Sequence, residues 1–324
     1  MILSVSRRTD IPNYYSDWFF NRIKEGFVYV KNPMNPHQVS KIGLSPEVVD
    51  CIVFWTKNPK PMMDKLEELS SYDYYFQFTL TGYGKDIESN VPHKRKVMIP
   101  IFQELSEKIG KERVIWRYDP ILFTKTYTPE YHLKAFEQIA RALKGYAEKC
   151  VISFVDEYTK NKKRMAILNP HELGEEKLLK FVKRINEIAS ENGIKVGSCA
   201  EAIDLESCGI EHNCCIEKAL IERITGSKLE VKKDKNQRKE CGCMESIDIG
   251  TYNTCRNGCR YCYANYSDRT VQQNCNKYDP ASPVLCGIIE EKDHITERKI
   301  KSLKQSDAWQ GKSSRERKRD NNYR

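Results

Sequence analysis

The stretch SIDIGTYNTCRNGCRYCYA, Ser246 to Ala264, joins a short β-branched run to three closely spaced cysteines. Cys255, Cys259 and Cys262 form a C-x3-C-x2-C array, with Tyr261 directly before the last thiol. Three such thiolates can hold three irons of a 4Fe-4S cluster and leave the fourth iron open, whereas a cluster used only for electron transfer normally has four cysteines. The array therefore predicts a metal cluster with one iron available for chemistry.

A structural zinc site is the main alternative for these cysteines. Zinc sites commonly use paired C-x2-C or C-x4-C spacings, which fit the array less well. Disulfides are less expected still, because the opening MILSVSRRTD is no secretory signal and no apolar run approaches the ~20 residues of a membrane span. Thirteen cysteines in a chain that we expect to be cytoplasmic, with no membrane association, indicate metal before disulfides.

Short β-branched and aromatic runs alternate with amphipathic segments along the chain, and this alternation is typical of βα units with a parallel sheet. The clearest helix is expected around residues 178–188. A length of 324 residues suits one α/β barrel. The sequence thus predicts an α/β fold with a full or partial (β/α) barrel. The expected strands are Ile2 to Ser6, Cys51 to Trp55, Tyr74 to Leu80, Arg113 to Arg117, Cys150 to Val155, Lys195 to Cys199 and Ser246 to Thr251.

Charged residues collect directly after the expected strands. In parallel sheets and barrels, active sites form at the C-terminal ends of the strands, so these residues are candidates for catalysis. Each of the arginines could pair with a neighbouring aspartate, or could bind an anionic substrate or cofactor carboxylate. The candidate catalytic residues are Arg7, Arg8, Asp10, Lys57, Arg117, Asp119 and Glu201.

The array, with its aromatic residue before the third cysteine, resembles that of the radical S-adenosylmethionine (SAM) superfamily. The whole chain resembles DUF1848, an uncharacterised bacterial family that carries these cysteines near its C-terminus. The resemblance implies an enzyme whose open iron binds SAM, and whose reduced cluster cleaves SAM to a 5′-deoxyadenosyl radical that acts on an unknown substrate. It also implies an electron donor such as flavodoxin or ferredoxin. Tyr261 would then pack against the adenine or fill space beside the cluster.

In the superfamily the cluster loop follows the first barrel strand, but here it follows the last expected strand. The first and last strands of a barrel are neighbours, so we expect a circularly permuted radical SAM-like barrel over residues 1–290, with the cluster strand and loop at 246–265. The strand at Ser246 to Thr251 should then lie beside Ile2 to Ser6. Thr56-Lys57 and Arg117-x-Asp119-Pro120 resemble strand-end motifs of the spore photolyase branch, whereas SVSRRTD stands where a glycine-rich GGE-type motif would be expected.

Residues 199–243 hold six further cysteines and are expected to form an auxiliary metal-binding insertion. Four thiolates from this segment could hold a second iron-sulfur cluster or one zinc ion, although buried cysteines are often inert. Cys208 and Cys214 are the alternates. The preferred ligand set is Cys199, Cys215, Cys241 and Cys243.

Two segments of the chain are rich in basic residues. The run from Lys232 to Lys239 is either a solvated loop or a site where Lys235 or Arg238 holds a cofactor carboxylate or phosphate. Residues 291–324 are expected to be a disordered basic tail, because residues 312–324 carry six basic residues, two acidic ones and few apolar ones. The alternative function is therefore a non-enzymatic iron-sulfur or zinc protein that binds nucleic acid through these segments.

Two common nucleotide-binding motifs and one histidine metal-binding motif are absent from the sequence. There is no G-x-x-x-x-G-K-[ST] loop, no strand followed by G-x-G-x-x-G, and no H-E-x-x-H pair. These absences argue against a P-loop nucleotide triphosphatase, a dinucleotide-binding domain and a histidine metal site.

Overall fold

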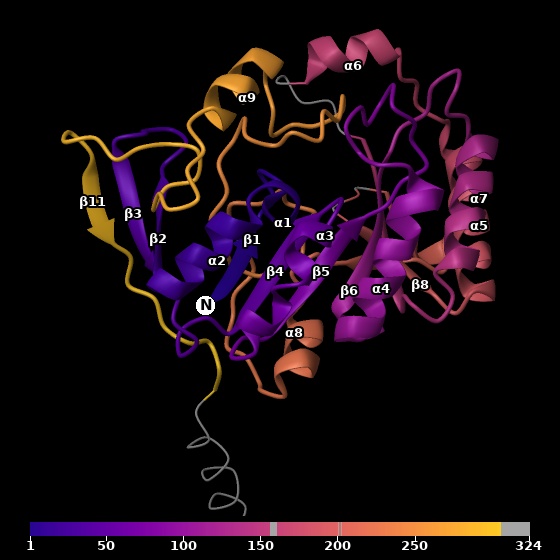
Figure 1. Cartoon of the computed structure of the whole chain (residues 1–324). Helices are drawn as coiled ribbons and strands as arrows, with labels where there is room; N and C mark the ends of the chain where they lie inside the picture. Colours follow the sequence, from indigo (N-terminus) through magenta and orange to yellow (C-terminus); the bar gives the residue numbers. More distant parts are fainter. Residues whose placement is uncertain (156–160, 200, 202, 306–324) are drawn as a thin grey trace, which may run out of the picture.

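A computed structural model describes residues 1–155, 161–199, 201 and 203–305. It has a mixed α/β fold built on a parallel eight-stranded sheet with the strand order β10-β1-β4-β5-β6-β7-β8-β9 (Figure 1). The strands of this sheet are β1 (Ile2–Val5), β4 (Cys51–Thr56), β5 (Tyr74–Thr79), β6 (Val114–Ile121), β7 (Lys149–Phe154), β8 (Lys195–Cys199), β9 (Glu211–Asn213) and β10 (Ile247–Asp248).

Helices connect most of these strands, as the alternation in the sequence predicts. The expected helix around residues 178–188 is present as α7, and its apolar stripe is buried. The α-helices are α1 (Ile11–Tyr14), α2 (Ser16–Glu25), α3 (Lys60–Met63), α4 (Ile99–Ile109), α5 (Pro129–Ala142), α6 (Lys162–Leu168), α7 (Glu175–Glu191), α8 (Lys218–Thr225) and α9 (Asp268–Cys275). Shorter turns are the 3-10 helices η1 (Leu66–Leu69), η3 (Lys111–Arg113) and η4 (Glu206–Cys208) and the π-helix η2 (Lys94–Met98).

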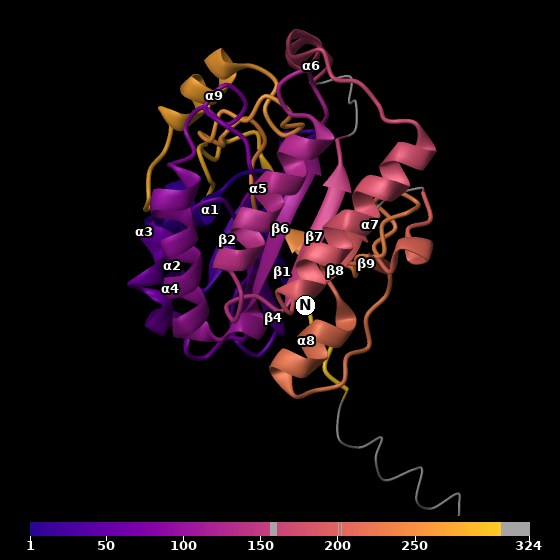
Figure 2. The same ribbon diagram turned by 90° about the vertical axis from the view of Figure 1, so that its right-hand side faces the viewer.

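The main sheet is buried on both faces, as parallel sheets usually are. One face packs against α2, α4, α5 and α7, and rings stack there, with Trp116 and Phe136 centroids 4.7 Å apart. Figure 2 shows α5 and α7 lying along the strands. Side chains alternate between the faces of a strand. The opposite face packs against α8 and the cysteine-rich segment and is called the cysteine face; it carries Ile2, Val53, Tyr75, Ile115 and Val151.

The predicted neighbour of the first strand is confirmed. β10 pairs in parallel with β1, placing Leu3 opposite Ile247 and Ser4 opposite Asp248. β10 is shorter than the strand expected at Ser246 to Thr251. In the described part of the chain, β10 and β9 are the two edges of the sheet and do not pair, so these strands form an open parallel sheet.

A second, three-stranded sheet was not predicted. Its strands are β2 (Phe27–Lys31), β3 (Gln38–Gly43) and β11 (His294–Glu297), and β11 runs parallel to β3. β11 lies within the segment expected to be a disordered tail. The edge of β3 supplies hydrogen-bond partners to its backbone, so β11 is ordered although all four of its residues are exposed. Residues 312–324, the most basic part of that tail, lie outside the described residues.

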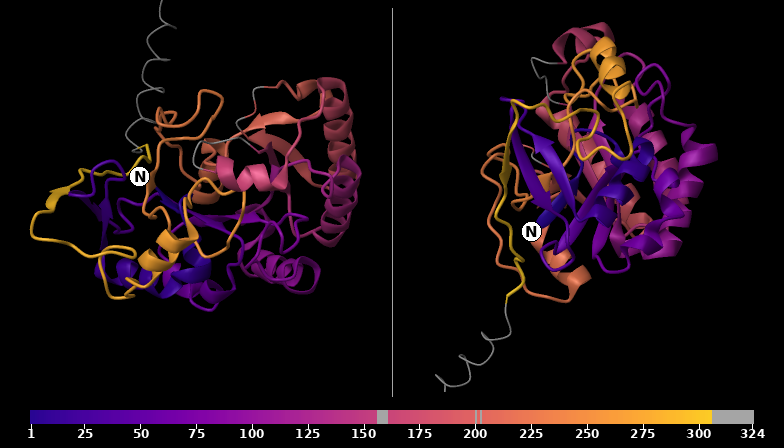
Figure 3. Two further views of the ribbon diagram at one scale, coloured as in Figure 1. Left: turned by 90° about the horizontal axis from the view of Figure 1, so that it is seen from above. Right: turned by 60° about the vertical axis from the view of Figure 1, so that its left-hand side comes forward.

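The first part of the segment that follows β10, up to the end of α9, lies over the C-terminal ends of the strands (Figure 1). It is coloured orange to yellow in Figures 1 and 3, and α9 belongs to it. Across the described residues, no helix combines the length and apolar character needed to cross a membrane.

His132 on α5 makes the stability of this fold depend on pH. It is fully buried, with Nδ1 2.9 Å from Tyr118 OH and Nε2 3.0 Å from the Leu122 carbonyl. Burial lowers the pKa of His132 to about 4, outweighing the opposing bond to Leu122. An unfolded histidine binds its proton near pH 6.5, so between pH 6.5 and 4 the unfolded state holds more protons than the folded state.

We therefore expect the free energy of unfolding to be unaffected by His132 above pH 6.5 and to lose about 3 kcal/mol through this residue by pH 4. Urea denaturation between pH 7.5 and 4 measures the loss. Because carboxylates also titrate in this range, the comparison is with His132→Gln, whose stability should fall less steeply with acid. Parallel pH profiles for the two proteins would contradict the assignment.

Candidate functional site

The three array cysteines lie on a loop, residues 252–264, that follows β10; it is called the array loop. Cys259 is buried, and Cys255 and Cys262 are partly buried. Gly258 has φ +67°, and a Cβ there would stand 2.2 Å from Ser89 Oγ. A glycine before Cys259 is thus required both by the left-handed turn and by the close approach of the β5–α4 loop. An antiparallel bridge between Glu88 and Cys259 joins these two loops.

Asp10 anchors the array loop to the first strand end. Its Oδ2 accepts hydrogen bonds from Asn257 Nδ2 at 2.9 Å and from Lys57 N at 2.8 Å, while Oδ1 accepts from Asn13 N at 3.2 Å and caps α1. Burial raises the pKa of Asp10, and these donors oppose the rise. Both carboxylate oxygens are engaged within the protein. Asp10 therefore positions the loop, which differs from the catalytic role considered from sequence.

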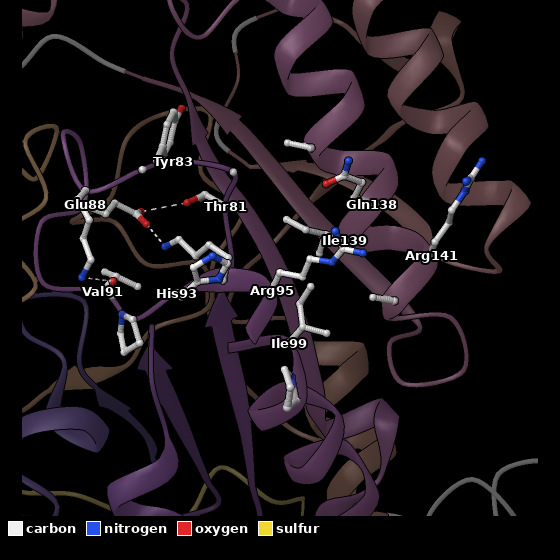
Figure 4. Close-up of a pocket in the computed structure, with 18 of the residues that line it drawn as sticks. Thr81, Tyr83, Glu88, Val91, His93, Arg95, Ile99, Gln138, Ile139 and Arg141 are labelled. Carbon is white, nitrogen blue, oxygen red and sulfur yellow. Dashed lines mark hydrogen bonds and ion pairs between the residues drawn. The ribbon is translucent and has the colours of Figure 1, made fainter. Parts of the chain in front are cut away.

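Glu88 forms a second anchor, which sequence reasoning missed. Its buried carboxylate bonds to Lys57 Nζ at 2.7 Å, to Lys94 Nζ, to Tyr261 OH and to Thr81 Oγ1 at 3.1 Å. Burial alone would raise the pKa of Glu88, but Lys57 and Lys94 lower it to about 2. Figure 4 shows Glu88 pointing toward Thr81. A glutamate in a polar loop usually faces water, so the sequence held no signal for this role.

Two cavities border these anchors. The larger, about 930 Å³, lies beside α4 and α5 and includes Glu88, Lys94 and Arg95 in its wall (Figure 4). The smaller, about 520 Å³, has Cys255 in its wall together with arginines that would favour an anionic ligand. These arginines are Arg164, Arg256 and Arg260. The smaller cavity therefore joins a candidate metal ligand to a basic surface.

Arg7, which follows β1, and Arg117, which lies in β6, come together around Trp55 of β4. Each guanidinium is 5.2 Å from the Trp55 ring centroid. Arg117 also forms an ion pair with Asp119. Arg7 Nη2 is buried without a hydrogen-bond partner among the described residues. Of the two, Arg117 is already engaged within the protein, while Arg7 keeps one buried donor.

The remaining candidates are spread more widely. Arg8 stacks on Tyr252, 5.1 Å from the ring centroid, and donates to the Gly250 carbonyl at 3.3 Å, so it supports the end of β10. Glu201 Oε1 accepts from Phe154 N at 2.8 Å, which places it at the end of β7.

Lys235 and Arg238 are exposed on the loop before Cys241. The Arg238 carbonyl accepts a hydrogen bond from Cys241 N at 3.0 Å. This loop therefore borders the second set of cysteines, whereas the smaller cavity beside Cys255 is lined by other arginines.

The preferred auxiliary cysteines come together on the cysteine face and are called the second thiol group. Cys208 does not join them: it packs in the core of the opposite face and its thiol donates to the Leu179 carbonyl at 3.5 Å. Cys214 is partly exposed and adjoins the group. The second thiol group comprises Cys199, Cys215, Cys241 and Cys243.

A family model described as a domain of unknown function (DUF1848) matches residues 2–264. The chain belongs to the DUF1848 family. No curated protein matched the chain. Because the DUF1848 match runs from β1 to just beyond Cys262, the main sheet, the second thiol group and the array loop are all parts of the DUF1848 domain.

The array thiols of this DUF1848 domain do not stand at the spacing that a single zinc ion requires. A tetrahedral zinc with Zn–S bonds of ~2.3 Å holds its sulfurs within about 4 Å of one another. Among the described residues, the one set of three His, Cys, Asp or Glu ligand atoms within 4.8 Å is His37, Glu290 and Asp293. The array thiols are therefore set wider apart than one zinc requires, while a four-iron core gives each thiolate its own iron.

Proposed function

We propose that this DUF1848 chain is a radical SAM-type iron-sulfur enzyme. In this proposal Cys255, Cys259 and Cys262 hold a 4Fe-4S cluster and SAM binds at the iron left open. The observation that carries the proposal is the anchoring of the array loop over the strand ends by the buried carboxylates of Asp10 and Glu88. A loop fixed in this way presents three thiols on a rigid base, which a preorganised metal site needs.

The cluster would supply one-electron cleavage of SAM to a 5′-deoxyadenosyl radical, while the protein binds, orients and excludes water. The cavity beside Cys255 is the proposed place for SAM. Its arginines carry charge complementary to the methionine carboxylate, and Arg164 Nη2 already donates to the Cys262 carbonyl at 2.7 Å. A carboxylate bound there would be held next to the array.

Tyr261 has a supporting role in this proposal. Its hydroxyl is bonded to Glu88, and its ring lies 5.6 Å from Lys57 Nζ and 5.9 Å from the Tyr83 ring centroid. These contacts favour the packing role over a contact with adenine, because other side chains of the protein already surround Tyr261. Tyr261 would thus hold Cys259 and Cys262 in place.

The substrate would meet the radical at the C-terminal ends of the strands, where parallel sheets bind their ligands. The parallel pairing of β10 with β1 supports the permuted barrel-like arrangement, since it brings the array loop beside the first strand.

The proposal is tested by anaerobic reconstitution of the full chain with iron and sulfide, followed by incubation with SAM and a reductant such as dithionite or reduced flavodoxin. We expect 5′-deoxyadenosine and methionine, detected by mass spectrometry, only when iron and reductant are both present. An iron-loaded chain that binds SAM but forms no 5′-deoxyadenosine under reduction would contradict the proposal.

A further inference from the structure

We propose that the second thiol group holds a metal centre of its own, an iron-sulfur cluster ligated by Cys199, Cys215, Cys241 and Cys243. This site is separate in sequence from the array loop. The proposal depends on the geometry of the cysteine face and does not require that the array bind SAM.

Three separate chain segments bring these thiols into a continuous row. Cys199 ends β8, Cys215 follows β9, and Cys241 and Cys243 precede β10. Cys199 Sγ lies 3.0 Å from Cys215 Sγ. The Cys243 thiol is hydrogen-bonded to both Cys215 and Cys241. All four side chains are buried in one cluster against the sheet. Four buried thiols from separate segments, each touching the next along a row, are more than isolated core cysteines require.

The backbone around the row is fixed by buried hydrogen bonds. Tyr75 OH and Gln77 Nε2 each donate to the Cys215 carbonyl at 2.8 Å. Ile216 N donates to Cys243 Sγ at 3.4 Å. A Cβ on Gly242 would stand 2.5 Å from Cys214 Sγ, so the glycine lets the Cys214 thiol pack closely against the C-x-C turn. The C-x-C turn is thus shaped to place both of its thiols on the cysteine face.

Two buried arginines face the row. Arg117 Nη1 lies 2.7 Å from Cys215 Sγ, and Arg7 interacts with Cys243 and Cys215 and has a buried Nη2 without a partner in the described part of the chain. Asp119 and Asp248 are the carboxylates that also face these arginines. A metal core bound by four thiolates keeps roughly two net negative charges, which two arginines can balance.

The length of the thiol row argues against a single zinc ion. Among the described residues, no three cysteine sulfurs lie within 4.8 Å of one another, so the four thiols form an extended row and not a compact tetrahedron. One zinc ion would need all four within about 4 Å of each other. A four-iron core gives each thiolate its own iron, so the touching thiols of Cys199 and Cys215 would turn apart to bind it. Four thiolates also leave no iron open, so this cluster would not bind SAM.

The test compares three variants of the full chain, each purified and reconstituted anaerobically with iron and sulfide. The Cys255→Ala, Cys259→Ala, Cys262→Ala variant should retain about four irons and the absorbance and electron paramagnetic resonance signals of a cluster. The Cys241→Ala, Cys243→Ala variant should lose about four irons relative to the parent. Cys208→Ala, a buried thiol outside both groups, should keep the parent's iron content.

The proposal would be overturned if the Cys255→Ala, Cys259→Ala, Cys262→Ala variant contained no iron, or contained zinc in place of iron. So would full iron content in the Cys241→Ala, Cys243→Ala variant, or an alkylation experiment that finds Cys199 and Cys215 joined as a disulfide. If circular dichroism shows that the double variant is unfolded, the array variant still decides the question, because its second thiol group is intact. Iron retained there, with no SAM cleavage by the parent, would reject the proposed function and leave this inference standing.

Discussion

Replacing Cys255, Cys259 and Cys262 together with alanine is expected to abolish formation of 5′-deoxyadenosine from SAM and to remove about four irons per chain. The reason is that each thiolate holds one iron, so the variant has no ligands left for the cluster whose open iron would bind SAM. The anchors of the array loop, Asp10 and Glu88, are unchanged in this variant. The loop should therefore keep its position while it loses its metal.

The measurements are iron content, product formation and binding of SAM to the reconstituted protein. Cys208→Ala is the matched control, because this thiol is also buried but lies on the opposite side of the sheet and should leave all three quantities at the parental level. Product formation at the parental rate by the array variant would show that the radical chemistry does not come from these cysteines. A variant that keeps the parent's full iron content would refute the assignment of the ligands.

Replacing Glu88 with glutamine is expected to lower the free energy of unfolding by about 3–5 kcal/mol. The Glu88 side chain has 0% of its surface exposed, and its lysine partners, Lys57 and Lys94, have 11% and 16%. A neutral amide would leave two nearly buried cations without their anion, and the desolvation cost of those cations would no longer be offset. Urea denaturation of the two proteins measures the difference.

Glu104→Gln provides the matched control. Glu104 pairs with Lys60 at 2.6 Å, but both side chains are about half exposed, so its loss should change stability little. Glu88→Gln combined with Lys94→Met should recover part of the loss, because one unpaired cation is removed. Equal stability of the Glu88→Gln and Glu104→Gln proteins would mean that the buried network does not stabilise the fold. Since Tyr261 loses its acceptor, the Glu88 variant should also hold the array loop less firmly.

Local pattern in the sequence was sufficient for much of this molecule. Each strand expected for the main sheet overlaps an observed strand, because parallel strands buried on both faces appear as short apolar runs. The expected pairing of the last strand with the first followed from the geometry of a closed barrel, and β10 and β1 do pair. The pairing does not extend to closure, since β9 and β10 are the edges of the described sheet.

The short elements could not be predicted. β9 has three residues and β11 has four exposed ones, so neither carries an apolar pattern of its own. β11 is ordered by pairing with β3, which lies more than 250 residues earlier in the chain. Because β11 carries no apolar pattern of its own, the sequence predicted disorder for this first part of the basic tail.

The sequence by itself determined the array, because Cys255, Cys259 and Cys262 lie within one short loop and their spacing is a local property. Only the tertiary structure decided what holds that loop, and which of the other cysteines gather. Asp10 and Glu88 reach the array from loops after β1 and β5, and Cys199 meets Cys215 while Cys208 packs on the other side of the sheet. Such contacts depend on which chain segments the parallel sheet places side by side, and spacing along the chain does not encode that arrangement.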